Sequence, residues 1–199
     1  MHTIRPPEYF PALPFWALVL KCDRVILADT IQYSRQSFQN RARLKTPDGR
    51  QWITIPLKGG QRGRPIAEVE IDNTVPWRGK HLRALQYNYR STPYFEAFED
   101  RFEMFFERDW QTLGSLSVGS IRLVCEILEI REPFVQSEGG RPAENSRELI
   151  LDSDRPVEGA KTLQFESQTY RQNFEGFEPG LSILDALFNL GFETLDLLG

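Results

Sequence analysis

The pattern of apolar and polar positions predicts alternating strands and helices at the start of the chain. A short strand is expected at residues 3–5, and a continuous apolar run follows at residues 25–28. Between them lies a segment at residues 13–21 that is apolar on nearly all sides. Continuous apolar runs are typical of parallel strands covered on both faces, and an apolar segment of this length is typical of a buried helix. We therefore expect a βαβ unit, in which the helix connects two parallel strands.

A β-hairpin is predicted next along the chain. Toward the end of residues 38–45, basic side chains alternate with uncharged ones, which is the two-residue period of a strand. Three basic side chains share one face of this strand: Arg41, Arg43 and Lys45. A Pro-Asp-Gly turn signal follows at residues 47–49, and residues 51–57 return as the second strand. Like charges this close repel one another, so they predict a bound anion such as a diphosphate, or else a solvated edge strand.

The rest of the chain is predicted to be mainly helical, because apolar residues recur there at helical spacing. Helices are expected over residues 77–90, 95–106, 113–129 and 182–190. Short strands are expected over residues 67–71, 148–151 and 162–165, and loops over residues 58–65 and 136–145. Together these elements indicate an α/β fold: a layered, Rossmann-like domain with a basic β-hairpin insertion and a helical C-terminal half.

Length and composition indicate a single domain over residues 1–199, with the basic hairpin region at residues 35–72. Cys22 and Cys125 each lie in an apolar run without a CxxC partner, which indicates buried free thiols in a reducing cytosol. No apolar run is long enough to span a bilayer and the N-terminus has no signal segment, so we expect neither a membrane-spanning nor a secreted protein. Two histidines and two cysteines are too few for a zinc centre, so we expect no metal site.

Charge is distributed unevenly along the chain. The net charge is −4, yet residues 37–64 contain seven basic residues and one acidic residue. Such a block in an acidic protein predicts an anion site, and the alternative is a solvated basic face. The interleaved aromatic residues would also allow stacking with nucleic-acid bases, whereas the acidic C-terminal half would repel a long polyanion. We therefore expect a phosphorylated small molecule as the partner, rather than nucleic acid.

Four residues outside the hairpin are candidates for binding or catalysis: Arg5, Tyr9, Lys80 and His81. Ligands of parallel sheets bind at the carboxyl ends of the strands, where Arg5 and Tyr9 are expected. The alternative for Arg5 is a salt bridge to Asp29 or a surface contact. His81 is the histidine best placed for acid–base chemistry near neutral pH, and a structural histidine is the alternative. The cations around it are expected to lower its pKa unless an anion is bound.

Four blocks of sequence resemble the WbqC-like protein family. The blocks are residues 5–11; residues 29–56, with the motif Phe-Gln-Asn-Arg-x-Arg-Leu-Lys-Thr at 38–46; residues 77–95, with Trp77, Lys80 and His81; and residues 170–191, with Tyr170, Gln172 and Asp185. The family's His-Gln pair in the first block is replaced by Arg5-Pro6, and its Gly-rich segment is not recognisable within residues 133–162. The chain is thus expected to be a divergent member with a shortened variable segment at residues 133–162.

The resemblance implies a cytoplasmic bacterial protein of surface-polysaccharide (O-antigen, lipopolysaccharide) biosynthesis, with transferase-like activity on a phosphorylated or nucleotide-linked sugar. On this interpretation His81 is the catalytic acid or base. Asp185, on the last predicted helix, is expected from its position to cap the helix or to form a salt bridge. The residues expected to bind substrate are Arg5, Tyr9, Gln39, Asn40, Arg41, Arg43, Lys45, Lys80, Tyr170 and Gln172. The alternatives are a non-catalytic binding or scaffold protein and, less favoured, a nucleic-acid-binding module. The sequence names no cofactor and no oligomeric state.

Overall fold

The computed structural model describes residues 2–131, 134–136 and 168–199. The strands expected over residues 148–151 and 162–165 lie outside the described residues, as does the loop expected over residues 136–145 apart from its first residue. The same holds for the variable segment at residues 133–162, apart from three residues near its start.

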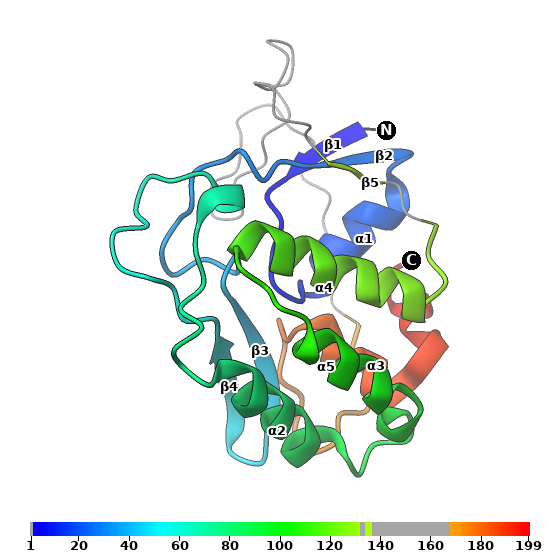
Figure 1. Ribbon diagram of the computed structural model, residues 1–199. Coiled ribbons are helices and arrows are strands. Elements are labelled where there is room, and N and C mark those ends of the chain that lie inside the picture. The colour runs from blue at the N-terminus through cyan, green and yellow to red at the C-terminus, as the bar shows by residue number, and fades with distance from the viewer. Residues whose placement is uncertain (1, 132–133, 137–167) are drawn as a thin grey trace.

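Three short parallel strands form a sheet at one end of the molecule (Figure 1). They are β1 (His2–Arg5), β2 (Arg24–Leu27) and β5 (Phe134–Gln136), in the order β1-β2-β5. Helix α1 (Leu13–Lys21) connects β1 to β2 and buries Trp16 completely, so the predicted βαβ unit is confirmed. Strand β5, which the apolar pattern did not predict, pairs with β2 in parallel, with Val135 opposite Ile26.

The predicted hairpin lies at the other end of the molecule, beside helix α2 (Figure 1). It consists of β3 (Arg41–Thr46) and β4 (Gly49–Thr54). Arg43 lies opposite Trp52 in the antiparallel register, and Gly49 takes a φ of +116° in the turn, a value that favours glycine. Ala42 and Leu44 are buried in the core, so the alternating basic residues of β3 lie on the opposite face of the hairpin.

The prediction of a strand over residues 67–71 was wrong. The segment begins as a 3-10 turn, η1 (Ile66–Glu68), and then forms isolated β-bridges instead of a ladder. Its backbone N–H groups bond to separate segments, because Ala67 N donates to Asp29 O at 2.9 Å while Ile71 N donates to Gln111 O at 2.9 Å. The apolar residues that suggested a strand instead anchor an irregular loop in the core.

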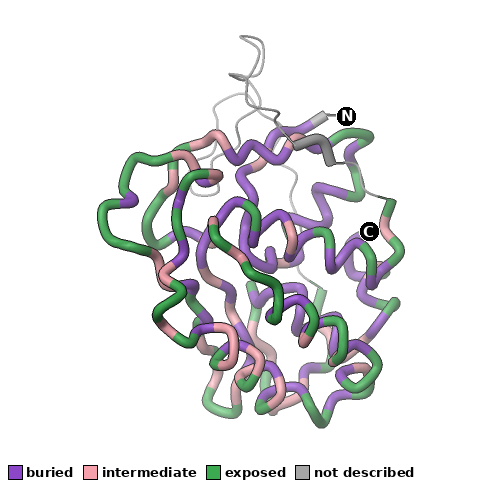
Figure 2. Tube along the Cα trace, viewed as in Figure 1, coloured by how far each residue is buried: buried purple, intermediate pink, exposed green. Residues whose placement is uncertain are grey.

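The helices predicted in the rest of the chain are confirmed. They are α2 (Trp77–Tyr89), α3 (Phe95–Glu107), α4 (Leu113–Ile127) and α5 (Ile183–Leu190), and the 3-10 helix η3 (Gly191–Leu197) follows α5. The ring of Phe102 on α3 lies 5.9 Å from that of Phe10 and 5.1 Å from that of Phe188 on α5, which joins the N-terminal loop to two helices. Buried residues run through α4 and α5, whereas the loop after β4 is largely exposed (Figure 2).

The described residues thus form a mixed α/β fold with two small sheets. The layered, Rossmann-like arrangement and the status of the hairpin as an insertion stay predictions. Within the described part of the chain, every helix is too short or too polar to cross a lipid bilayer.

Candidate anion-binding site

A cavity of about 460 Å³ lies between the end of β4, the turn before the hairpin and the glycine-rich loop after it. Three cations line it, Arg35, Lys58 and Arg62, together with the polar residues Tyr33 and Asn40. The described residues that line the cavity include no carboxylate. The volume falls in the range of small-molecule sites, and the excess of positive charge favours an anionic ligand.

The glycine-rich loop is shaped by its backbone and by one buried side chain. Gly60 has a φ of +74°, in the left-handed region that favours glycine, and open space surrounds the position that a Cβ would occupy. The buried Gln61 donates from Nε2 to Gly59 O at 3.1 Å and accepts at Oε1 from Glu70 N at 3.1 Å. Lys58 Nζ lies 3.5 Å from a Glu70 carboxylate oxygen, in an exposed ion pair. The loop is thus held in place while its cations remain at the cavity.

Asn40, one of the residues predicted to bind substrate, lines this cavity, and Gln39 lies beside it in sequence. Asn40 Nδ2 donates to Ile55 O at 3.2 Å, and Gln39 Oε1 accepts from Ser34 N at 2.9 Å. Both side chains therefore have structural partners, and they fix the segment that carries Tyr33 against the hairpin.

The pKa of Tyr33, the tyrosine that lines the cavity, is influenced by the charges around it. Burial raises the pKa of Tyr33, and the nearby positive charges of Arg35 and Arg41 act in the opposite direction. Arg41 Nε donates to Ser37 O at 3.1 Å, so this guanidinium is held beside the cavity. The predicted cation Arg41 thus adds to the positive charge of the site without lining it.

On the outer face of the hairpin, cations stack on aromatic rings. The guanidinium carbon of Arg41 lies 4.1 Å from the ring centroid of Trp52, and that of Arg43 lies 4.5 Å from Trp52 and 5.0 Å from Phe38. Burial lowers the pKa of Arg43, and the charges of Arg50 and Arg41 lower it further. Such stacking is favourable for the cation, so it offsets part of the repulsion between these neighbouring charges.

The third predicted cation of the hairpin has an internal role. Lys45 is only 2% exposed, and its Nζ donates to the backbone carbonyls of Glu175 and Gly176, each at 3.1 Å. Its backbone N–H donates to the hydroxyl of Tyr89 at 2.9 Å. Lys45 therefore ties the hairpin to α2 and to the segment that precedes α5.

Tyr170 and Gln172, both predicted to bind substrate, lie in this same junction. The Tyr170 hydroxyl donates to Asp185 Oδ2 at 2.6 Å, while Gln172 bonds twice to the backbone of Glu178, at 2.9 Å in each direction. Asp185 is fully buried, and burial raises its pKa to about 6 although hydrogen bonds from Tyr170 and Tyr89 act against the rise. We name Lys45, Tyr89, Tyr170, Gln172 and Asp185 the polar junction.

His81 lies behind the cavity wall, in contact with Tyr9. The ring Nδ1 of His81 accepts from the Tyr9 hydroxyl at 3.0 Å, and Nε2–H donates to the carbonyl of Thr54, a cavity-lining residue, at 3.2 Å. Burial lowers the pKa of His81 to about 4, so the imidazole is neutral at pH 7. The expected lowering therefore comes from the aromatic surroundings, which include Trp77 and Phe106, rather than from neighbouring cations.

The remaining predicted residues lie apart from the cavity. Arg5, at the carboxyl end of β1, pairs with Glu8 at 3.2 Å, and Lys80 is exposed on α2. The structure therefore brings Asn40, Arg41 and, through Thr54, His81 to one site, and places Lys45, Tyr170 and Gln172 in the polar junction.

Lys58 and Arg62 fall within the basic block predicted to bind an anion. Sequence reasoning nevertheless named none of the three lining cations as a site residue, and it missed the buried state of Asp185. A signal existed for both. Residues 58–64 interleave cations with glycines, a composition that exposes backbone N–H groups beside positive charge. Asp185 is the one charged residue of the mainly apolar helix α5, which indicates a carboxylate facing the core.

Comparison with known proteins supports the resemblance seen in the sequence. The family model described as the WbqC-like protein family matches residues 6–165 and 157–197. The uncharacterized protein Rv1507c of Mycobacterium tuberculosis (strain ATCC 25618 / H37Rv) is 29% identical over 218 residues, which cover 96% of this chain and 94% of that protein. No solved structure matches the chain. Since the family model spans nearly all of the sequence, the chain belongs to the WbqC-like protein family.

Proposed function

We propose that the chain binds a phosphorylated, nucleotide-linked sugar in the cavity beside the glycine-rich loop, and that it serves a transferase-like step of surface-polysaccharide biosynthesis in the cytoplasm. The observation that carries the proposal is a cavity of about 460 Å³ lined by Arg35, Lys58 and Arg62, with no carboxylate among its described lining residues. A diphosphate ester carries two negative charges, which several fixed cations can balance.

The other lining groups suit the rest of such a ligand. The ring of Tyr33 offers an apolar surface to a base or a sugar, and the glycine-rich backbone allows close approach of a phosphate. His81 is proposed as a positioning residue: its bond to Thr54 O holds the end of β4, which forms one wall of the cavity. Direct acid–base chemistry by His81 stays a prediction, and it would require the imidazole to exchange one of its two internal hydrogen bonds for substrate.

A non-catalytic binding protein is the second candidate function. It is favoured by the internal partners of the predicted catalytic and phosphate-binding groups, since His81 bonds to Tyr9 and Thr54 and Arg5 pairs with Glu8. Turnover of a nucleotide-linked sugar would separate the two functions, because the cavity is expected to bind the ligand in both.

Replacing two cavity cations is expected to weaken ligand binding about 100-fold or more. Charge-assisted hydrogen bonds contribute ~1.5–3 kcal/mol each, and ~1.4 kcal/mol corresponds to tenfold in affinity. Isothermal titration of a nucleoside diphosphate sugar into the Lys58→Gln/Arg62→Gln variant measures this loss. Raising the salt concentration should lower log K with a slope near two for a diphosphate, whereas a slope of several units indicates a nucleic acid.

The matched control for this titration is Arg83→Gln/Arg90→Gln, which removes two exposed cations that do not line the cavity. It should bind as the wild type does. If the Lys58→Gln/Arg62→Gln variant keeps an affinity within twofold of the wild type while its circular dichroism is unchanged, the cavity is not the binding site.

A further inference from the structure

A second basic cleft, of about 320 Å³, lies between α3 and α4. Its charged lining comes from Arg101 on α3, Arg108 just after α3, Arg122 on α4 and one carboxylate, Glu126. The indole of Trp110 forms part of the wall. None of these residues lines the cavity of the proposed function, and α3 lies on the other side of the molecule from the glycine-rich loop (Figure 1).

The cleft has an excess of positive charge, although the segment that forms it contains more acidic than basic residues. Residues 95–129 contain eight acidic residues and three basic residues. The cleft is lined by all three basic residues, Arg101, Arg108 and Arg122. Of the eight acidic residues, one lines it, Glu126. Arg101 and Arg108 make no ion pair among the described residues, although acids outnumber bases around them. Arg101 and Arg108 therefore line one cleft without an ion-pair partner among the described residues, which predicts an anion as their partner.

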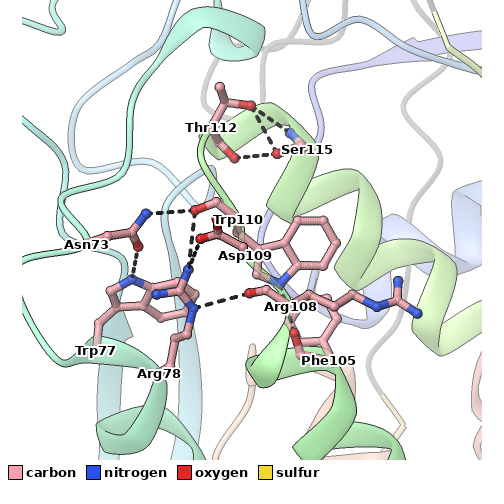
Figure 3. Close-up of polar contacts among 9 residues, drawn as sticks. All are labelled: Asn73, Trp77, Arg78, Phe105, Arg108, Asp109, Trp110, Thr112 and Ser115. Atoms are coloured by element: carbon pink, nitrogen blue, oxygen red, sulfur yellow. Dashed lines mark hydrogen bonds and ion pairs between the residues drawn. The ribbon is translucent and has the colours of Figure 1, made fainter.

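The loop that carries Arg108 and Trp110 is held by helix α2 and by the segment just before this helix. Arg78 Nε donates to Arg108 O at 3.3 Å, and Arg78 Nη2 lies 3.4 Å from Asp109 Oδ1. Asn73 Nδ2 donates to Trp110 O at 3.0 Å, and Figure 3 shows Asn73 and Arg78 reaching this loop together. These bonds satisfy the loop carbonyls, so the loop keeps its shape without a ligand and little ordering remains to be done on binding.

The position of the indole depends on a glycine of α4. Trp110 Nε1 donates to Phe105 O at 2.8 Å, which fixes the ring at the end of α3 (Figure 3). A Cβ at Gly119 would lie 2.3 Å from the ring, so only glycine allows the indole to lie against the helix. The wall of the cleft is therefore built by a specific close approach between the loop and α4.

We infer that this cleft binds an oligophosphate group, carried by a nucleoside or present as free pyrophosphate. Guanidinium groups pair with phosphate oxygens through two parallel hydrogen bonds, and the two charges of Arg101 and Arg108 match a diphosphate better than a single carboxylate. The aromatic wall next to them suits the base or sugar of a nucleotide. This inference is independent of the ligand proposed for the first cavity.

The test is made in the Lys58→Gln/Arg62→Gln background, so that the first cavity does not contribute. Pyrophosphate and ADP are titrated calorimetrically at 0.15 M salt, and one site is expected for each. Adding Arg101→Gln/Arg108→Gln should weaken both about 100-fold, whereas adding Arg83→Gln/Arg90→Gln should change neither. Equal affinities for pyrophosphate and ADP would place the recognition in the phosphates, and tighter binding of ADP would add a contact from the nucleoside.

Gly119→Ala provides a second test that leaves the charge unchanged. The added methyl group displaces the indole, so weaker binding with an unchanged circular dichroism spectrum is expected. Absence of binding in the background variant, binding that survives loss of Arg101 and Arg108, or equal binding of citrate would each overturn the inference. If instead the proposed function of the first cavity is wrong, the Lys58→Gln/Arg62→Gln variant would bind nucleotide sugars as tightly as the wild type does.

Discussion

Asp185→Asn is expected to stabilise the protein at pH 7 by up to about 3 kcal/mol. Burial raises the pKa of Asp185 from 3.8 to about 6, and each unit of pKa corresponds to ~1.4 kcal/mol. A raised carboxyl pKa means that the folded state holds the proton more tightly than the unfolded state. The stability that this proton provides is fully present below pH 4 and is lost as the pH rises to about 6. Asparagine is never ionised, and its side-chain oxygen can still accept from the Tyr170 hydroxyl.

Urea unfolding followed by circular dichroism between pH 4 and 7 measures the effect. The free energy of unfolding of Asp185→Asn should rise relative to that of the wild type over this range. Asp196→Asn, an exposed acid on η3, is the matched control and should follow the wild type. A variant that is less stable than the wild type at pH 7 would show that the ionised carboxylate is needed by Lys45 and the tyrosines of the polar junction.

His81→Gln is expected to show the opposite pH dependence, together with a loss of about 2–4 kcal/mol at pH 7. The loss follows from two buried hydrogen bonds, from Tyr9 and to Thr54, and from the aromatic packing of the ring. Burial lowers the pKa of His81 from 6.5 to about 4, so the unfolded state binds the proton more tightly. In the wild type this contribution is present above pH 6.5, and about 3 kcal/mol of it is lost as the pH falls to 4.

The destabilisation caused by His81→Gln should therefore shrink as the pH falls from 7 to 4 in the same urea experiment. Lys80→Gln, one residue earlier on the exposed side of α2, should show no such change. A destabilisation that stays constant across this range would mean that His81 is not held neutral by its surroundings. That result would restore the imidazole as a candidate for direct proton transfer.

The two groups act in opposite directions over nearly the same pH range, because one is a buried acid and the other a buried base. Their contributions to the wild-type stability largely cancel between pH 4 and 6. In each single variant, the free energy of unfolding should therefore change with pH as the remaining group dictates. The polar junction and the site of His81 can in this way be probed without knowledge of the ligand.

Local pattern was enough to predict most of the elements of this fold. The apolar segments at residues 13–21 and 25–28 indicated the βαβ unit, the alternation and turn at residues 38–57 indicated the hairpin, and helical spacing indicated α2 to α5. These features depend on residues close in sequence. The prediction failed at residues 67–71, where apolar residues are buried singly against distant segments, a situation that no local period describes.

Patterns in the sequence were enough to identify the family, the parallel unit and the basic hairpin, and they predicted an anion site within residues 37–64. Which cations line a cavity and which hold the fold together depends on contacts in three dimensions. Lys45 does not line the cavity, because its ammonium group donates to carbonyls about 130 residues away in sequence. Asp185 and His81 acquired their unusual pKa values, and the arginines of α3 and α4 their common cleft, because burial and convergence depend on contacts between segments far apart in the chain.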